Sequence, residues 1–284
     1  MIAITGANGK LGQLVVSALL QVLPATQIVA AVRNTAKADR LQALGVEVRE
    51  ADYDRPESLE AAFKGVEKVL LISAVQPGQR LRQHKAVIDA AKRASVKLIA
   101  YTSMLRADTS SLILAAEHKE TEEYLKNLGI DFVLLRNGWY LENHTEALGQ
   151  AIISGSIYAS AGQGKFASAS RADYAAAAVT VLTQSGHTNR TYELAGDHSF
   201  TLEELAEEVS KQAGRKIVYQ NLPPAEYGAM LLGFGLPQFI VDVVVDADVN
   251  AVQGELDSPA RDLSELLGRK STALSDAIKA ALHT

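Results

Sequence analysis

Hydrophobic runs recur along the first half of the chain and predict a series of strands joined by helices. The runs are rich in Val, Ile and Leu and show little alternation, which is typical of strands covered on both faces. The expected strands are Ile2–Thr5, Gln27–Arg33, Val46–Glu50, Lys68–Ser73, Val96–Ser103 and Asp131–Arg136. The segments between them are predicted as helices over Lys10–Val22, Thr35–Leu44, Pro56–Lys64, Gln79–Ala94 and Ile113–Leu128.

The ends of these helices and the shortness of the links predict a parallel sheet. Gly45, Gly65 and Gly129 follow three of the helices, where a left-handed cap is favoured. Repeated strand–helix units with short links require right-handed crossovers. The expected fold class is therefore α/β, a doubly wound parallel sheet of the Rossmann type.

The pattern changes after Arg136. Short strands are expected at Ser156–Ser160, Thr191–Leu194 and Lys216–Gln220, mixed with several helices. Thr201–Glu204 is a capping box that begins a helix ending near Gly214. The chain contains no repeat and no long linker, so we expect a Rossmann-type domain over residues 1–136. Residues 137–284 are expected to form a smaller α+β lobe, docked on the sheet and partly interleaved with it.

Composition and charge narrow the class of protein. The chain has 284 residues, of which 48% are hydrophobic and 21% charged, as in ordinary globular proteins. A net charge of -5 argues against a nucleic-acid partner. The absence of cysteine excludes disulfides, thiolate catalysis and cysteine-bound metals, and the histidines show no metal-ligand spacing. No basic segment precedes the first strand, so we expect no signal peptide.

One uncharged stretch, residues 11–32, is long enough to cross a bilayer. Pro24 lies in its middle, and polar residues such as Ser17 and Gln21 dilute its hydrophobicity. A buried helix followed by a buried strand explains this stretch better than a membrane span does. We therefore expect a cytoplasmic protein without a membrane partner.

The loop between the first strand and the first helix has three glycines, Gly6, Gly9 and Gly12. In such a turn the first glycine makes the bend, the second lets backbone amides approach a diphosphate, and the third lets helix and strand pack closely. The helix N-terminus then presents its partial positive charge to the phosphates. A glycine-rich turn without a ligand is the alternative, but the position in the first strand–helix unit favours a dinucleotide.

The end of the second strand distinguishes between the two nicotinamide dinucleotides. An NAD site would have a carboxylate there, whereas this chain has Arg33. A guanidinium suits the additional 2′-phosphate of NADP in both charge and geometry. Lys10 and Lys37 add positive charge nearby, although Arg33 in a solvated surface position is the alternative.

Two further segments lie at the expected ligand edge of the sheet. The fourth strand ends in Ser73, Ala74 and Val75, whose small side chains let the backbone pass close to a cofactor. Asp52 and Tyr53, after the third strand, either contact an adenine or form a simple turn.

The spacing Gly-x-x-Gly-x-x-Gly resembles the short-chain dehydrogenase/reductase superfamily, but the acid found in its typical members is absent. Those enzymes use Tyr-x-x-x-Lys, in which the tyrosine protonates the substrate carbonyl. None of the nine tyrosines has a lysine four residues later. The helix expected to carry the pair has His118 and Glu122 instead. A quinone would suit this site, because its reduction yields a weakly basic hydroquinone anion that needs positioning more than a dedicated acid.

Four residues are candidates for contact with the substrate or the reacting atoms. Asn137 could bond a carboxamide or quinone oxygen, and Trp139 or Tyr140 could cover a flat ring. Trp139 could equally be a packing residue between lobes. His118 is either a proton donor or a helix-surface histidine near Glu122.

Motifs along nearly the whole chain give a family resemblance. The segments ITGANGKLG, VAAVRN, LLISAVQPGQR, IAYTSMLRADTS, EHKETEEYL, LLRNGWYLEN and SRADYAAAA together resemble the NmrA-like atypical short-chain dehydrogenase/reductase family, most of all its bacterial NAD(P)H:quinone oxidoreductases of type 2. The resemblance implies an NADPH site between the two lobes. Its lining residues would be Gly6, Ala7, Asn8, Gly9, Lys10, Leu11, Gly12, Arg33, Ser73, Ala74, Val75, Gly138, Trp139, Tyr140, Leu141, Glu142, Asn143 and Ala169.

The expected function is an NADPH-dependent quinone oxidoreductase that transfers hydride to a small quinone in one two-electron step. A monomer or a homodimer is expected. The alternative is a non-catalytic NADP(H)-binding redox sensor of the NmrA type, acting through a protein partner. A reductase for an activated imine or enone is a third possibility.

Overall fold

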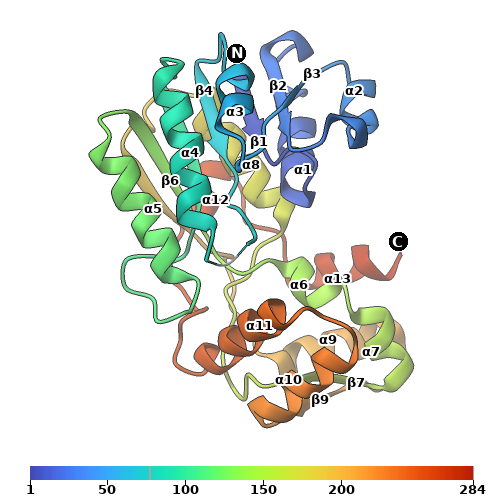
Figure 1. The fold of residues 1–284 in the computed structure, drawn as a ribbon. Coiled ribbons are helices and arrows are strands. Elements are labelled where there is room, and N and C mark those ends of the chain that lie inside the picture. The colour runs from blue at the N-terminus through green and yellow to red at the C-terminus, as the bar shows by residue number, and fades with distance from the viewer. Residues whose placement is uncertain (77, 284) are drawn as a thin grey trace. The chain divides into compact units, whose positions relative to one another are not determined.

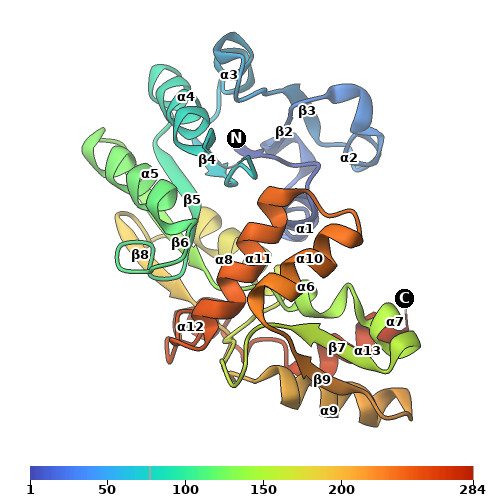
Figure 2. The ribbon, with the colours of Figure 1, turned by 60° about the horizontal axis from the view of Figure 1, so that its bottom comes forward.

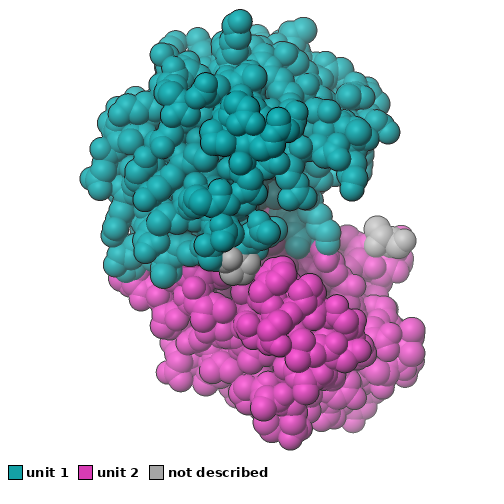
Figure 3. Space-filling view, in the orientation of Figure 1, with its two compact units in different colours: residues 1–108, 116–137, 171–193 teal, residues 109–115, 138–170, 194–284 magenta. Residues whose placement is uncertain are grey.

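A computed structural model describes residues 1–76 and 78–283, which fall into two units (Figures 1 and 3). The first unit consists of residues 1–108, 116–137 and 171–193. The second consists of residues 109–115, 138–170 and 194–284. Residue 136, the expected boundary, is one residue short of the end of the segment 116–137.

A seven-stranded sheet forms the centre of the first unit (Figure 1). In spatial order its strands are β3 (Glu47–Glu50), β2 (Ile28–Val32), β1 (Ile2–Thr5), β4 (Lys68–Leu71), β5 (Leu98–Met104), β6 (Asp131–Asn137) and β8 (Arg190–Leu194). Ile2 of β1 is in register with Ile28 on one side and Lys68 on the other, both in parallel pairs. Because β2 and β4 flank β1, the strand order reverses there, and open α/β sheets bind ligands at such a point.

The helices of the first unit cover both faces of this sheet, which confirms the predicted fold class. They are α1 (Lys10–Leu19), α2 (Asp39–Ala43), α3 (Pro56–Ala62), α4 (Arg80–Arg93), α5 (Ala115–Asn127) and α8 (Arg171–Thr183). On the face covered by α3, α4 and α5, a core of buried side chains includes Phe63, Ile88 and Tyr101. The strands β1 and β2 are buried throughout, as their unbroken apolar runs predict.

The predicted helix over Thr35–Leu44 is wrong in its first part. Residues Thr35–Lys37 form a single 3₁₀ turn, and α2 begins only at Asp39. The side chain of Asn34 accepts a hydrogen bond from Ala36 N at 2.9 Å, and this local bond favours a turn over a continuous helix.

The last strand of the sheet comes from late in the chain. Asn189 N donates to Phe132 O, and Gly138 N donates to Leu194 O, so β8 runs beside β6 in the same direction. The preceding helix α8 packs on α1, which lies about half the chain away in sequence. Its alanine-rich sequence, with Ala175, Ala177 and Ala178 buried, permits this close approach. Residues 171–193 therefore belong to the first unit although they follow residue 137.

The second unit contains a short parallel pair of strands and several helices. β7 (Ser156–Ala159) pairs with β9 (Val218–Asn221), and the two lie side by side in Figure 2. The helices are α6 (Leu141–Thr145), α7 (Leu148–Ser154), α9 (Leu202–Ala213), α10 (Pro224–Gly233), α11 (Gln238–Ala251), α12 (Asp262–Leu267) and α13 (Leu274–Leu282). The predicted capping box is confirmed, because Glu204 N donates to the Thr201 hydroxyl and Thr201 N donates to the Glu204 carboxylate.

The uncharged stretch over residues 11–32 contains most of α1 and all of β2. Within the part of the chain that the structure describes, no helix has the length and apolarity needed to span a membrane.

Candidate functional site

The glycine turn between β1 and α1 is shaped by contacts that exclude larger residues. Gly6 has a φ of +59°, a conformation that L side chains rarely adopt. Gly9 N donates to Gly6 O at 2.9 Å and closes the turn. A Cβ on Gly12 would lie 2.5 Å from Gly6 O and 2.7 Å from Ala7 Cα, closer than real Cβ contacts. The three glycines thus let the N-terminus of α1 lie directly against the end of β1.

A cavity of about 470 Å³ opens beside this turn at the carboxyl ends of β1, β2 and β4. It lies within the first unit, and its volume is in the range of small-molecule sites. The lining residues are Gly6, Asn8, Gly9, Val32, Arg33, Ala51, Asp52, Tyr53, Asp54, Ile72, Ser73, Ala74, Val75, Gln76 and Gln83.

Seven of the predicted cofactor-binding residues meet at this cavity: Gly6, Asn8, Gly9, Arg33, Ser73, Ala74 and Val75. Among the others, Lys10, Leu11 and Gly12 lie in the first turn of α1 and Ala7 is buried behind the loop. Sequence reasoning missed three polar lining residues, Asp54, Gln76 and Gln83. Only Asp54, close to Asp52 at the end of β3, had a signal that could have revealed it.

The charged residues of the cavity lining are Arg33, Asp52 and Asp54. Arg33 is exposed and lines the cavity. The nearby carboxylate of Asp54 is bonded to the side chains of Arg82 and Gln83. The Arg82 bond, followed by the Gln83 bond, holds the pKa of Asp54 below its usual range, and the charge of Arg33 adds a smaller effect. The Asp54 carboxylate is thus already bonded to two other side chains, and contact between Arg33 and a phosphate stays a prediction.

For Asp52 and Tyr53 the sequence left open a simple turn or a contact with an adenine, and the structure shows a turn that also lines the cavity. Asp54 N donates to Asp52 Oδ1 at 3.0 Å, which is a local turn bond. Both residues also line the cavity. The Tyr53 hydroxyl lies 2.6 Å from Thr5 Oγ1 and 3.0 Å from Ile72 O, so this ring joins β1 to the end of β4. Contact with an adenine stays a prediction.

His118 lies in the protein interior, so its alternative assignment to the helix surface is wrong. Only 5% of it is exposed, and its Nδ1 lies 2.6 Å from the Tyr101 hydroxyl. Burial lowers the pKa of His118 well below its usual value, so the imidazole is neutral. The residue does not line the cavity of the first unit. Its role as a proton donor stays a prediction.

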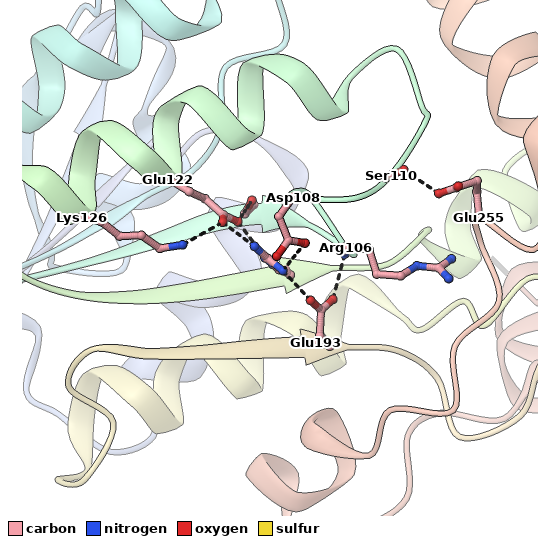
Figure 4. A network of polar contacts seen from close by, with 9 residues as sticks. Arg106, Asp108, Ser110, Glu122, Lys126, Glu193 and Glu255 are labelled. Carbon is pink, nitrogen blue, oxygen red and sulfur yellow. Dashed lines mark hydrogen bonds and ion pairs between the residues drawn. The ribbon is translucent and has the colours of Figure 1, made fainter.

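Glu122, on the same helix, belongs to a buried ion network (Figure 4). Ser103 Oγ donates to the Glu122 carboxylate at 2.6 Å, and the Arg136 guanidinium contacts both carboxylate oxygens at 2.9 and 2.6 Å. Arg136 also contacts Asp108 and Glu193. Helix α5, which has no Tyr-x-x-x-Lys pair, therefore contributes structural contacts to β5 and β6.

Asn137, the last residue of β6, has a feature typical of a ligand site. Its side-chain oxygen is buried, and within the described ranges 1–76 and 78–283 it has no hydrogen-bond partner. A buried acceptor without a partner is costly and calls for an explanation, such as a bound ligand.

In the second unit, the predicted loop Gly138–Asn143 lies against Ala169. Ala169 N donates to Trp139 O at 3.2 Å, and Leu141 N donates to Ala169 O at 2.9 Å. Asn143 N donates to Tyr140 O at 3.0 Å as α6 begins, and Glu142 lies in the first turn of this helix. Trp139 and Tyr140 are half-buried, which agrees with either ring stacking or packing.

The parallel sheet, the glycine turn and the cavity beside it define a Rossmann-type dinucleotide-binding protein. The sequence matches the NmrA-like family over residues 1–276, and the chain belongs to this family. The predicted family is thereby confirmed.

Individual proteins similar to this chain include reductases of known structure. The chain is 51% identical to "Quinone oxidoreductase 2" of Escherichia coli over 278 residues, which cover 98% of this chain and 97% of the relative. It is similar to a crystal structure of an Escherichia coli NADPH-dependent quinone oxidoreductase complexed with NADPH, with 50% identity, a TM-score of 0.96 and coverage of 99% and 100%. It is also similar to Citrobacter sp. triphenylmethane reductase complexed with NADP(H), with 39% identity, a TM-score of 0.95 and the same coverage.

Proposed function

We propose that this protein is an NADPH-dependent quinone oxidoreductase that transfers hydride to a small quinone in one two-electron step. The observation that carries the proposal is the meeting of the glycine turn, Arg33 and the segment Ser73–Val75 at one cavity. The proposal is further supported by the sequence, which is 51% identical over nearly its full length to a quinone oxidoreductase. We further propose that the protein acts in the cytoplasm as a monomer or homodimer.

The residues at this cavity fit NADPH. The glycine turn brings the N-terminus of α1 to the cavity, where its amides suit a diphosphate. Arg33 would hold the 2′-phosphate, and Ser73–Val75 would form the wall towards the nicotinamide. The buried side-chain oxygen of Asn137 would accept a hydrogen bond from a ligand amide. When bound, NADPH supplies the hydride.

Residues of the second unit are also assigned to this site. We propose that Gly138–Asn143 and Ala169, which are joined by backbone hydrogen bonds, contact the cofactor. The rings of Trp139 and Tyr140 would cover the flat substrate.

The chemistry of the side chains favours a quinone over an ordinary ketone. Glu122 is held in the ion network, and His118 is neutral and hydrogen-bonded to Tyr101. A neutral imidazole and an ion-paired carboxylate are poor acids for an alkoxide, and a proton-donor role for His118 towards a hydroquinone anion stays a prediction. A hydroquinone anion is much less basic and can take its proton from water. The residues of the site therefore need to orient the two reactants and exclude side reactions.

The test is turnover by the purified protein with NADPH and a series of small benzoquinones and naphthoquinones. We expect one hydroquinone formed for each NADPH consumed, with slower turnover when NADH replaces NADPH. No turnover with any small quinone would overturn the proposal. NADP(H) binding without turnover, with a preference for one redox state, would support the redox-sensor alternative instead. Light scattering of the same sample gives the oligomeric state, and cell fractionation gives the location.

A further inference from the structure

The backbone that leaves β4 is held by side chains at three successive amides. Ile72 N donates to Thr5 Oγ1 at 3.1 Å, and Ser73 N donates to Thr102 Oγ1 at 2.9 Å. Ala74 N donates to His84 Nε2 at 2.9 Å. These three residues line the cavity, so this wall of the cavity is fixed from behind by side chains of β1, β5 and α4.

The peptide groups of Ala74 are held on both sides by α4. While His84 accepts from Ala74 N, Arg80 Nε donates to Ala74 O at 2.9 Å. Arg80 and His84 are four residues apart, so they project from the same face of the helix. Together the two side chains form hydrogen bonds with both backbone groups of Ala74. We call this pair the Ala74 clamp.

His84 is set for this contact by its surroundings. The side chain is fully buried, and because Nε2 accepts, the proton lies on Nδ1, which is 3.1 Å from Thr121 Oγ1. Thr121 in turn donates to Glu117 O at 2.8 Å. Burial, with a smaller effect from the charge of Arg80, lowers the pKa of His84 to about 3. The imidazole therefore remains neutral and keeps its accepting lone pair.

Arg80 is fixed in the same way from α5. Its side chain is nearly completely buried, and its guanidinium contacts the Glu117 carboxylate at 2.9 Å. Arg80 N also donates to the other Glu117 oxygen at 3.2 Å. A planar guanidinium can join two acceptors in fixed directions, which an ammonium does less well. The Ala74 clamp is thus itself anchored through Thr121 and Glu117 of α5.

We propose that Arg80 and His84 are positioning residues for hydride transfer, because they fix the cavity wall Ser73–Val75 against which the cofactor would lie. The proposal rests on the proposed function, since it assigns NADPH to this cavity. Neither residue lines the cavity, so each acts through the Ala74 backbone. Small displacements of a reacting group lower rates strongly, so loosening this wall should slow turnover more than it weakens binding.

Two substitutions of the same residue separate positioning from general structure. His84→Gln places an amide oxygen near the former Nε2 and can still accept from Ala74 N. His84→Asn places its amide near the former Nδ1, so it keeps a contact with Thr121 but loses the one with Ala74. We expect kcat to fall about tenfold in His84→Asn, as for loss of one buried hydrogen bond, and to stay near wild type in His84→Gln. The Kd for NADPH should change less than kcat.

A second readout reports on the transfer itself. With NADPH deuterated at the transferred hydrogen, the isotope effect on kcat should rise in His84→Asn, because the transfer step becomes slower relative to the other steps. Arg80→Lys keeps a positive charge beside Glu117 but lacks the planar group that joins it to Ala74 O, and it should show the same change. It serves as the second variant if His84→Asn does not fold.

Tyr124→Phe is the matched control. Its hydroxyl donates to Asp89 at 2.6 Å, so this variant also loses a hydrogen bond between α4 and α5 but leaves Ala74 untouched. We expect wild-type kcat. The inference about the Ala74 clamp would be wrong if His84→Asn or Arg80→Lys folded and kept wild-type kcat. It would also be wrong if His84→Gln were as slow as His84→Asn. Neither result would contradict the proposed function. A wild-type protein without quinone turnover would overturn the proposed function, and this inference with it.

Discussion

At the scale of single residues, we expect the choice of cofactor to depend on Arg33. The side chain is exposed and lines the cavity, and the carboxylate of Asp54, which lines the same cavity, is already bonded to Arg82 and Gln83. Its position at the end of β2 could be predicted from sequence, because strand ends follow from the local pattern. The bonds of Asp54 to Arg82 and Gln83 of α4 could not be predicted.

Replacing Arg33 by Asp should separate the two nicotinamide cofactors. NADPH binding is expected to weaken by about 1.5–3 kcal/mol, because a charge-assisted contact with the 2′-phosphate is lost, while NADH binding changes little. Calorimetric titration of both cofactors measures the difference. Arg55→Asp is the control, since Arg55 is an exposed arginine that does not line the cavity. Equal losses for NADPH and NADH would refute the assignment of the 2′-phosphate.

At the scale of elements, the first strand–helix unit and α5 illustrate two different outcomes of sequence reasoning. The glycine turn was placed correctly because its conformation is set by residues within one short segment. The environment of α5 was not. The sequence left His118 open as either a proton donor or a helix-surface residue near Glu122, whereas in the structure His118 contacts Tyr101 and Glu122 contacts Arg136. Packing of the helix on the sheet, and not its own sequence, decides which side chains are buried.

Gly12→Ala should disrupt the first strand–helix unit. Its Cβ would lie 2.5 Å from a backbone oxygen, and overpacking of this kind costs about 1–3 kcal/mol of folding free energy. NADPH binding should weaken as well, because the loop must shift. Denaturant unfolding and cofactor titration measure both effects.

Gly149→Ala provides the matched control for this glycine. Gly149 lies in α7 with open space around the position of a Cβ, so its replacement should gain up to about 0.5–1 kcal/mol. If Gly12→Ala were as stable as Gly149→Ala and bound NADPH like wild type, the close approach of α1 to β1 would be unimportant.

At the scale of the whole molecule, one buried carboxyl group should make the stability of the protein depend on pH. Asp248 of α11 is buried and accepts a hydrogen bond from Ser160 N at 2.8 Å. Burial raises the pKa of Asp248 from 3.8 to about 6, against the smaller lowering effect of that hydrogen bond. Between these two values the folded protein binds a proton that the unfolded chain does not bind. The contribution of this bound proton to the free energy of unfolding is therefore complete below about pH 4 and is lost as the pH rises through about 6.

Asp248→Asn should remove this dependence. The amide oxygen can still accept from Ser160 N, and no charge is buried at neutral pH. We expect the variant to match wild type near pH 4 and to exceed its stability by about 2–3 kcal/mol above pH 7. Thermal melting across this pH range measures the difference. Asp242→Asn, an exposed site on the same helix, should show no such trend; a parallel trend there would point to a general charge effect.

The sequence by itself determined the alternation of strands and helices, the glycine turn, the family and the residue type at the end of β2. These features depend on local periodicity, on turn conformation and on motifs that lie within short segments. Only the tertiary structure decided that β8 is the seventh strand of the first sheet, that α8 packs on α1, that His118 is buried and that Arg80 and His84 hold Ala74. Most of these contacts join residues far apart in the chain. The bonds to Ala74 join nearby residues, but they depend on how α4 packs on the sheet, and no local sequence pattern encodes that packing.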